Sequence, residues 1–378
     1  MKRVGIIGGG QLAWMMASAA QKLKLELVVQ TPNVEDPACA IASETIFAAV
    51  DDAIATALLA TKCDIITFEN EFVNLDALSI LELQGVCFRP KLQALVPLLD
   101  KYHQRCYLRD LGLRVPQFFA VDNQLDNQKI TSLGFPLVLK SRRHGYDGQG
   151  TFIIHDFASL QPKLDYNNTE TAFLIEEFIP FDRELAIIAA RSQDGEVVTY
   201  PVVETQQEEQ VCRRVIAPAE ITPNQAAEIT YYAHTILNSL DAVGVFGIEL
   251  FLTKDGQILV NEIAPRTHNS GHFSLDACET SQFEQHLRAV CGLSLGNPAL
   301  DWKSAVMVNL LGYENSHSDY QKKRSHLEQI PQSHLYWYGK TTSRIGRKLG
   351  HITVKLHHPN REEAIKVAHS IESIWYPS

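Results

Sequence analysis

The sequence predicts an α/β protein, α+β overall, that opens with a doubly wound parallel sheet. In the N-terminal quarter of the chain, short apolar strands alternate with helical patterns, which is typical of a parallel sheet with helices on both faces. Farther along, strand follows strand, and Asp255-Gly256 joins two apolar runs, so antiparallel sheet is expected there. At 378 residues the chain exceeds one typical hydrophobic core, which indicates two or three domains.

We place the domain boundaries where these patterns change. An N-terminal domain is expected over residues 1–99, a middle domain over 100–300 with a flap at about 115–178, and a small C-terminal domain over 301–378. Strands are expected at 3–7, 25–30, 45–50, 63–68, 136–140, 151–155, 172–178, 184–190, 197–204, 246–252, 258–263, 305–311, 335–338 and 351–355. Helices are expected at 222–240, 281–290 and 362–371, among others.

Composition excludes several classes of function. The formal net charge of −10 argues against nonspecific nucleic-acid binding as the main activity, although local basic loops can still bind small anions. No apolar run reaches the ~18 residues of a membrane span, and the N-terminus enters a strand pattern without the apolar segment of a signal peptide. The seven cysteines include no CxxC, which favours reduced thiols in a cytoplasm over disulfides or a zinc site.

A glycine loop, Gly8-x-Gly10-x-x-Ala13, follows the first strand. It resembles a dinucleotide-binding fingerprint, but the acid that would hold the ribose about 20 positions on is absent, because the second strand ends at Gln30. We therefore expect only that the loop amides and the next helix hold one phosphate. Ligands of such sheets bind beyond the carboxyl ends of the strands. The residues expected at this crevice are Gly8, Gln11 and Glu69, each just past a strand end.

A lysine and a glycine-rich loop follow the strand at 136–140. Lys140 ends that strand, and residues 141–151 run Ser-Arg-Arg-His-Gly-Tyr-Asp-Gly-Gln-Gly-Thr into another strand. Such a flap can close its backbone amides over phosphates while the lysine supplies a point charge. It is not a Walker loop, because GxxxxGK[ST] is missing and no helix follows. A plain exposed hairpin turn explains these residues about equally well.

Charged side chains at three further places are candidates for contacts with a nucleotide or another anionic substrate. Glu176 and Glu177 end a strand, where they either accept hydrogen bonds from ribose hydroxyls or form a solvated edge. Arg213 lies in an apolar stretch and suits an anionic substrate or a transferring phosphoryl group. Near the C-terminus, Lys340 and residues 343–348 form a basic loop that is either solvated surface or a site for one more phosphate.

The two strands around Asp255-Gly256 carry the most specific prediction. This dipeptide favours a two-residue hairpin loop, and that register places Glu249 directly opposite Glu262. Opposed carboxylates repel, and two hard oxygen donors suit Mg²⁺ (or Mn²⁺) that also takes phosphate oxygens. The alternative is a solvent-facing edge with two unrelated acids. The polar run from Arg266 to His272, directly after the second strand, favours the metal site.

Three features together predict a magnesium–nucleotide site. They are a glutamate pair for a metal, a lysine with a glycine flap, and basic loops in the first and last domains. The residues therefore indicate an ATP-dependent ligase or kinase that acts on an anionic co-substrate. They do not determine the acceptor.

Four motifs resemble one family of such enzymes. They are Gly8-Gly-Gly-Gln-Leu12, the flap Gly145-Tyr-Asp-Gly-Gln-Gly150, the run Asn261-Glu-Ile-Ala-Pro-Arg-Thr-His-Asn-Ser-Gly-His272, and Trp337-Tyr-Gly-Lys340 with Gly346-Arg-Lys-Leu-Gly-His351. In this order, over essentially the whole chain, they are similar to the N5-carboxyaminoimidazole ribonucleotide synthetase family of the ATP-grasp superfamily. The resemblance implies an ATP-grasp fold with an N-terminal pre-ATP-grasp domain, and a homodimer.

The resemblance also implies the reaction. Members of the family use ATP and bicarbonate to carboxylate the exocyclic amine of 5-aminoimidazole ribonucleotide in de novo purine biosynthesis. ADP and phosphate are released, and carboxyphosphate is the intermediate. The flap is expected to exclude water, because carboxyphosphate otherwise hydrolyses.

The family's site residues map onto this chain position by position. Those expected to bind ATP are Lys101, Lys140, Gly145, Tyr146, Asp147, Gly148, Gln149, Gly150, Thr151, Glu176, Glu177, Phe178, Ile179, Glu184, Gln207, Asn261 and Glu262. Those expected to hold the metal are Glu249 and Glu262. Those expected to act on bicarbonate and carboxyphosphate are Arg266, His268 and Asn269, with Arg213 as a further catalytic residue. Those expected to hold the ribonucleotide are Gly10, Gln11, Leu12, Glu69, Tyr146, Asp147, Lys340, Arg347 and Lys348.

Three alternatives remain open. Another ATP-grasp ligase, such as a formate-dependent glycinamide ribonucleotide transformylase or a biotin carboxylase, fits the nucleotide site, but the last two motifs favour the carboxylating synthetase. A nicotinamide-dependent oxidoreductase would use the glycine loop, and Gln30 argues against it. The intact glutamate pair and Lys140 disfavour a catalytically inactive module. The chain departs from the family's usual residues at Ala13-Trp14, Gln149, Thr151, Thr267 and Ile345, none of which belongs to the metal pair.

Overall fold

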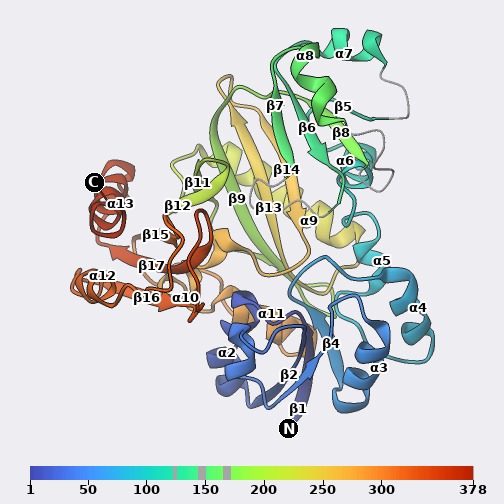
Figure 1. Cartoon of the computed structure of the whole chain (residues 1–378), viewed down its shortest axis with the longest axis vertical. Helices are drawn as coiled ribbons and strands as arrows, with labels where there is room; N and C mark the ends of the chain where they lie inside the picture. The colour runs from blue at the N-terminus through green and yellow to red at the C-terminus, as the bar shows by residue number, and fades with distance from the viewer. Residues whose placement is uncertain (122–125, 144–149, 165–171, 378) are drawn as a thin grey trace.

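The computed structural model describes residues 1–121, 126–143, 150–164 and 172–377 and arranges them around three sheets (Figure 1). A four-stranded sheet forms the N-terminal part, and a nine-stranded sheet runs through the centre. A second four-stranded sheet, drawn in green, forms the flap part at the end of the molecule far from the N-terminus (Figure 1). None of the helices in these ranges has the length and apolar character needed to cross a membrane.

The N-terminal sheet is parallel throughout, in the order β3-β2-β1-β4, as the alternating pattern predicts. Its strands are β1 (Lys2–Ile7), β2 (Leu25–Thr31), β3 (Glu44–Phe47) and β4 (Ile65–Phe68). The helices around it are α1 (Gln11–Trp14), α2 (Ala17–Leu23), α3 (Ala53–Lys62) and α4 (Leu75–Leu83). Strand β3 ends before the predicted residue 50, because the chain turns where the Asp52 amide donates to the Ala49 carbonyl.

The central sheet has the order β14-β13-β9-β11-β12-β15-β17-β16, with β10 paired to β9. Its strands are β9 (Phe181–Arg191), β10 (Val197–Thr199), β11 (Val203–Glu208), β12 (Val211–Ala217), β13 (Gly244–Thr253), β14 (Ile258–Ala264), β15 (Ser304–Leu311), β16 (Ser333–Trp337) and β17 (Lys348–Leu356). The predicted strand 197–204 is wrong as a single strand. It breaks around Pro201, which has no amide to donate to a ladder. Because β12 pairs with β15, the C-terminal strands extend the middle sheet.

The flap sheet has the order β5-β8-β6-β7. Its strands are β5 (Phe118–Ala120), β6 (Leu137–Ser141), β7 (Thr151–Ile154) and β8 (Phe173–Glu177), with the helices α7 (Asn127–Leu133) and α8 (Phe157–Leu160). It has a hydrophobic core of its own around Leu137 and Leu139, so Lys140 projects from a rigid strand. Further helices are α5 (Leu92–Leu95), α6 (Lys101–Asp110), α9 (Pro223–Ser239), α10 (Ser274–Ala277), α11 (Gln282–Cys291), α12 (Gln321–Leu327) and α13 (Arg361–Trp375).

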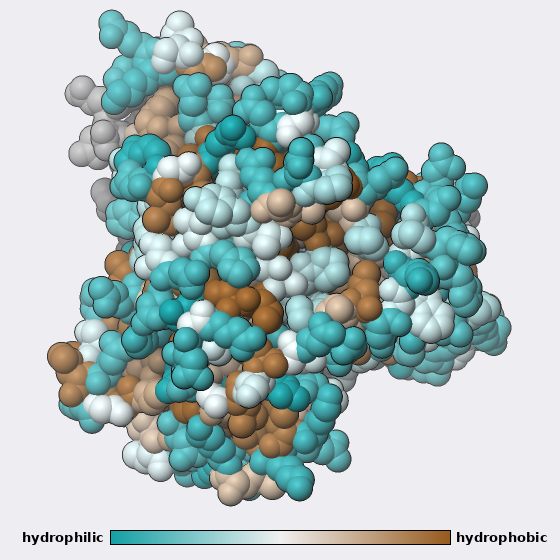
Figure 2. Space-filling model, turned by 180° about the vertical axis from the view of Figure 1, so that it is seen from behind, coloured by the Kyte–Doolittle hydropathy of each residue, from teal (hydrophilic) through white to brown (hydrophobic). Residues whose placement is uncertain are grey.

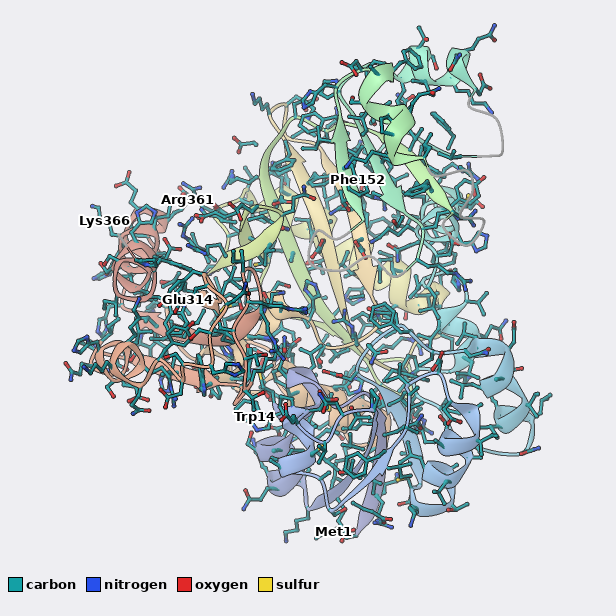
Figure 3. All side chains as sticks on the ribbon, viewed as in Figure 1. Met1, Trp14, Phe152, Glu314, Arg361 and Lys366 are labelled. Atoms are coloured by element: carbon teal, nitrogen blue, oxygen red, sulfur yellow. The ribbon has the colours of Figure 1, made fainter. Side chains whose placement is uncertain are left out.

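Side chains join the parts of the chain. Trp14 lies where the N-terminal part meets the C-terminal strands, and its ring packs edge-on against Tyr338 with centroids 6.1 Å apart (Figure 3). Arg361, at the start of α13, donates two hydrogen bonds of 2.7 Å to the buried carboxylate of Glu204 on β11 (Figure 3). Seen from behind, the surface is mainly hydrophilic with scattered hydrophobic patches, as is usual for a globular protein (Figure 2).

A buried histidine links the N-terminal sheet to the central one. His286, in α11, is fully buried. Its Nδ1 accepts a hydrogen bond of 3.2 Å from the Val245 amide on β13, so Nε2 carries the proton and donates to the Thr67 hydroxyl on β4 at 2.8 Å. Both ring nitrogens are therefore used in the neutral form.

Acid should destabilise the protein through this histidine. Burial lowers the pKa of His286 from 6.5 to about 4. Between these values the unfolded chain binds more protons, so the stability contributed by the neutral ring is complete above pH 6.5 and is lost as the pH falls toward 4. We expect the thermal midpoint to fall over this range. The thermal midpoint of His286→Gln should be lower than that of the wild type at neutral pH and should fall less steeply as the pH falls. The thermal midpoint of the exposed control His369→Gln should follow that of the wild type. Equal slopes for wild type and His286→Gln would contradict this.

Candidate functional site

The hairpin of β13 and β14 places Glu249 opposite Glu262, which confirms the predicted pair. The predicted two-residue loop is wrong. The Thr253 amide donates to the Gln257 carbonyl at 2.9 Å, so the loop consists of residues 254–256. A register shift next to Glu249 then restores the pairing. The longer loop and this bulge each move the register by one residue and offset each other.

The extra residue of the bulge is Asn261. In the ladder Glu249 pairs with Glu262, and the next pair is Leu250 with Val260. Strict alternation would put neighbouring residues on opposite faces of the sheet. Instead, Asn261 Nδ2 lies 3.4 Å from Glu249 Oε2, on the face that also carries Glu262. The bulge therefore adds an amide beside the two carboxylates.

Both glutamates contact a basic side chain. Glu262 Oε1 lies 2.5 Å from Lys101 Nζ, and Glu249 Oε1 lies 3.3 Å from His268 Nε2. Burial would raise the pKa of Glu249, but His268, Lys101 and Lys140 outweigh burial and lower the pKa to about 2. Glu249 is therefore ionised at neutral pH, as a metal ligand must be.

The glutamate pair fits a divalent cation that the protein coordinates only in part. In the part of the chain that the structure describes, no group of three or more His, Cys, Asp or Glu could hold a metal. Mg²⁺ commonly takes one or two carboxylates and completes its octahedral shell with phosphate oxygens and water. Two opposed glutamates with lysines beside them for the phosphates match that requirement.

A buried ion-pair network lies beside the glutamate pair. Glu176 lies 2.7 Å from Lys140 Nζ through Oε2 and 2.5 Å from Arg105 Nε through Oε1. Burial would raise the pKa of Glu176, but Arg105 and Lys140 lower it to about 2. Both cations also reach Asn261 Oδ1, at 3.4 and 3.1 Å. Glu176 is therefore not a solvated strand edge. Sequence reasoning missed Arg105, although it lies one helical turn after Lys101.

The first turn of α6 connects Lys101 to the flap. Asp100 caps the helix by accepting hydrogen bonds from the amides of Tyr102 and His103, at 2.9 and 3.2 Å. It also accepts from Arg142 Nε at 3.0 Å, and the Lys101 amide donates to the Arg142 carbonyl at 2.9 Å. The base of the flap loop and Lys101 are therefore held together.

Other residues predicted to bind ATP lie on the surrounding strands. Glu184 on β9 pairs with Phe251, and burial together with the charge of Glu249 raises the pKa of Glu184 to about 7. Glu177 accepts a hydrogen bond of 2.8 Å from the Gln117 amide. Phe178 and Ile179 follow β8, and Gln207 lies on β11. Thr151 is the first residue of β7, and Gly150 directly precedes it. The predicted flap residues Gly145, Tyr146, Asp147, Gly148 and Gln149 lie outside the described residues.

The N-terminal glycine loop binds a carboxylate of the protein itself. The amides of Gly10 and Leu12 donate to Glu69 at 3.0 and 3.2 Å, and a Cβ at Gly10 would collide with Glu69 Oε1. Burial, partly offset by the Gly10 amide, raises the pKa of Glu69. The expectation that these amides hold a phosphate is therefore corrected, because Glu69 takes that place.

A cavity of about 1010 Å³ brings together residues from all three parts of the chain. Of the predicted site residues it is lined by Gly10, Gln11, Leu12, Glu69, Lys101, Thr151, Gln207, Arg213, Glu249, Glu262, Arg266, His268, Asn269, Lys340, Arg347 and Lys348. Lys140 and Glu176 do not line it, because both are buried in the ion-pair network. The other described site residues that do not line it are Gly150, Glu177, Phe178, Ile179, Glu184 and Asn261.

The loop after β14 is held by residues from distant parts of the chain. Arg266 Nε lies 2.9 Å from Glu71 Oε1, in the N-terminal part. His268 contacts Glu249, as described above, and Asn269 exchanges hydrogen bonds of 3.0 and 2.7 Å with Asn309 on β15. Sequence reasoning missed Glu71 and Asn309, because neither lies near the loop in the sequence.

The C-terminal basic loop meets the N-terminal part at the cavity. Lys340 Nζ donates to Gln11 Oε1 and to the Lys348 carbonyl, both at 2.8 Å. Arg347 donates to the Thr342 carbonyl at 2.7 Å, which orders the turn. The predicted ribonucleotide residues of the two ends of the chain are thereby brought together.

Arg213 reaches the cavity from β12. Its guanidinium carbon lies 3.3 Å from the centre of the Tyr376 ring, and its Nε lies 3.5 Å from Glu372 Oε1. The C-terminal helix α13 and the residue after it therefore hold this side chain in position.

Three family models match the chain in succession. Residues 1–97 match the ribonucleotide synthetase preATP-grasp domain, residues 106–283 the ATP-grasp domain, and residues 305–366 the phosphoribosylaminoimidazole carboxylase C-terminal domain. Solved structures match as well. The synthase of Aspergillus clavatus in complex with ADP and 5-aminoimidazole ribonucleotide has a TM-score of 0.90 at 30% identity and covers 99% of this chain and 98% of that one. The synthetase of Thermotoga maritima has a TM-score of 0.87 at 37% identity with the same coverage.

Relatives match in sequence over the full length. The N5-carboxyaminoimidazole ribonucleotide synthase of Synechococcus elongatus is 54% identical over 380 residues, which cover 99% of this chain and 96% of the relative. The synthase of Synechocystis is 51% identical over 389 residues, which cover 99% of this chain and 98% of the relative. Since both relatives match at more than 50% identity over 99% of the chain, the chain belongs to the N5-carboxyaminoimidazole ribonucleotide synthase family of ATP-grasp enzymes.

Proposed function

We propose that this chain uses ATP and bicarbonate to carboxylate the exocyclic amine of 5-aminoimidazole ribonucleotide, with release of ADP and phosphate. The observation that carries the proposal is the cavity that unites the glutamate pair, the loop after β14 and the C-terminal basic loop. Related enzymes of Aspergillus clavatus that bind ATP, or ADP with 5-aminoimidazole ribonucleotide, support it.

The phosphates of ATP would lie between the flap and the glutamate pair. Lys101 and Lys140 supply positive charge for them. Burial lowers the pKa of Lys140, and the charge of Glu176 opposes that shift, so the buried acid helps to keep the lysine protonated. The contact between Asp100 and Arg142 holds the base of the flap beside Lys101.

Glu249 and Glu262 would hold Mg²⁺. When bound, the cation would neutralise charge on the phosphate oxygens as the γ-phosphoryl group leaves. The contact with His268 orients Glu249 and lowers its pKa, and the contact with Lys101 fixes the position of Glu262. Asn261, placed by the bulge, links this pair to the buried Lys140.

Bicarbonate would react beside the loop after β14. Its oxygen attacks the γ-phosphorus, which gives carboxyphosphate and ADP. The amine of the ribonucleotide then attacks the carbon of carboxyphosphate and displaces phosphate. Alternatively, carboxyphosphate first divides into carbon dioxide and phosphate, and the amine attacks the carbon dioxide. In both cases the amine loses a proton, which the released phosphate can accept. Arg266 and the Asn269 amide are donors suited to these oxyanions, and Arg213 faces the same cavity. The flap would exclude water from carboxyphosphate.

The ribonucleotide would bind where the two ends of the chain meet. Lys340, Arg347 and Lys348 are cations suited to its phosphate. The hydrogen bond from Lys340 to Gln11 connects this loop to the N-terminal part. Glu69, which holds the glycine loop, lines the same region.

The alternatives receive no support from the site. Gln30, where a ribose-binding acid of a nicotinamide enzyme is expected, is buried and donates to the carbonyls of Ala49 and Asp52 at 2.7 and 3.2 Å. Glu69 occupies the glycine-loop amides. The C-terminal family model favours the carboxylating enzyme over other ATP-grasp ligases. The homodimer remains a prediction from the resemblance. The cytoplasmic location also remains a prediction, which the seven free cysteines support.

Phosphate release from ATP tests the proposed reaction. With Mg²⁺ present, we expect release to rise strongly only when bicarbonate and 5-aminoimidazole ribonucleotide are both added, and carboxylated product to form in equal amount. Stimulation by formate or biotin would favour another ligase. Release that depends on neither bicarbonate nor the ribonucleotide would refute the proposal.

Glu262→Gln tests the metal assignment. Losing one of two anionic ligands should reduce ATP hydrolysis by about 100-fold or more at ordinary magnesium, with little change in the thermal midpoint. Glu328→Gln, an exposed acid at the C-terminal end of α12, serves as the control and should keep wild-type turnover. Near-normal turnover of Glu262→Gln would show that the glutamate pair does not hold the metal.

Lys348→Ala tests the C-terminal loop. Removing a cation from the phosphate site should raise the KM for 5-aminoimidazole ribonucleotide by about tenfold and leave the KM for ATP within about twofold. Lys366→Ala, an exposed lysine on α13 that does not line the cavity, should change neither constant (Figure 3). If both constants rose equally in Lys348→Ala, the loop would have another role.

A further inference from the structure

Asn309 is a fully buried amide in β15 that none of the roles above includes. It pairs with His351 on β17, so its backbone belongs to the C-terminal strands. Its side chain contacts Asn269 in the loop after β14 and the carbonyl of Cys212 on β12. One side chain thus joins three segments that lie far apart in the sequence.

These contacts determine the orientation of the Asn309 amide. Its Nδ2 donates to Asn269 Oδ1 at 2.7 Å and to the Cys212 carbonyl at 2.9 Å, and its Oδ1 accepts from Asn269 Nδ2 at 3.0 Å. A primary amide has two N–H groups, and both are used here. With nitrogen and oxygen exchanged, the Asn309 oxygen would face the Cys212 carbonyl, which burial makes unfavourable.

The orientation of Asn309 determines that of Asn269. Asn309 Nδ2 and Oδ1 lie in fixed places. Asn269 must therefore turn its Oδ1 toward Asn309 Nδ2 and its Nδ2 toward Asn309 Oδ1. The second N–H of Asn269 has no hydrogen-bond partner among the described residues, so it remains for a ligand. Asn269 lines the cavity with Arg266 and His268, and an N–H in that position suits an oxyanion.

We propose that Asn309 is a positioning residue for carboxylation, which orients Asn269 so that its remaining N–H can bind bicarbonate and the carboxyphosphate formed from it. The inference rests on the proposed function. Asn309 does not line the cavity, and it acts only through Asn269. Its hydrogen bond to Cys212 ties it to β12, so the loop after β14 and the strand that carries Arg213 share one anchor.

Asn309→Asp is the test, because it keeps the shape but removes both N–H donors and places a charge against Asn269 Oδ1 and the Cys212 carbonyl. We expect the KM for bicarbonate to rise by about tenfold and the KM for ATP to stay within about twofold. Phosphate release should exceed carboxylated product, because misplaced carboxyphosphate is lost to water. A purely structural role would lower phosphate and product together.

Gln285→Glu is the matched control. Gln285 is also fully buried, and both ends of its amide bond to the backbone of Gly296 at 2.8 Å, away from the cavity. The Gln285→Glu variant should have a lower thermal midpoint than the wild type, but it should still release phosphate and form carboxylated product in equal amounts. Asn309→Ser keeps one donor without a charge and should show the same uncoupling to a smaller degree, which provides the measurement if the aspartate variant does not fold.

An unchanged KM for bicarbonate with equal phosphate and product, in either folded Asn309 variant, would overturn the inference. Failure of the proposed function has a different result, since the wild-type chain would then release no phosphate in response to bicarbonate and the ribonucleotide.

Discussion

The opposition of Glu249 and Glu262 across one hairpin is the constraint on which the rest of the site depends. Two carboxylates on neighbouring strands repel each other, so the fold must bring basic side chains to them. Lys101 comes from α6 and His268 from the loop after β14, and each contacts one glutamate. The flap sheet contributes Lys140 through Asn261. Elements far apart in the sequence converge on this hairpin because each supplies a basic side chain or an amide to it.

The main effect of the buried charges around the hairpin is to hold side chains in place, not to add stability. Moving an ion pair out of water costs about as much as the attraction returns, so the contacts of Glu176 with Arg105 and Lys140 are poor candidates for net stabilisation. They do hold the lysine at one place beside Asn261. Neutral polar contacts work in the same way elsewhere. His286 ties β4 to β13, and Asn309 ties the loop after β14 to β12.

The parts of the site that could be predicted from the sequence are those with local causes. The glutamate pair follows from hairpin register, and it was found even though a longer loop and a bulge each shift that register. The spacing from Lys101 to Arg105 is one helical turn, so the missed arginine was within reach of the same reasoning. Glu71 and Asn309 could not be found by this reasoning, because the sequence of the loop after β14 does not indicate which distant side chains it will contact.

By itself, the sequence determined the α/β class, most strand positions and the opposed glutamates, and its motifs determined the family. Only the tertiary structure decided that Glu69 occupies the glycine loop, that Glu176 pairs with Lys140, and which partner orients Asn269. The reason is physical. The spacing of hydrophobic residues and the residue types in turns act over short stretches of chain. The partner of a buried polar group depends instead on which side chains lie near it in space once whole sheets have packed.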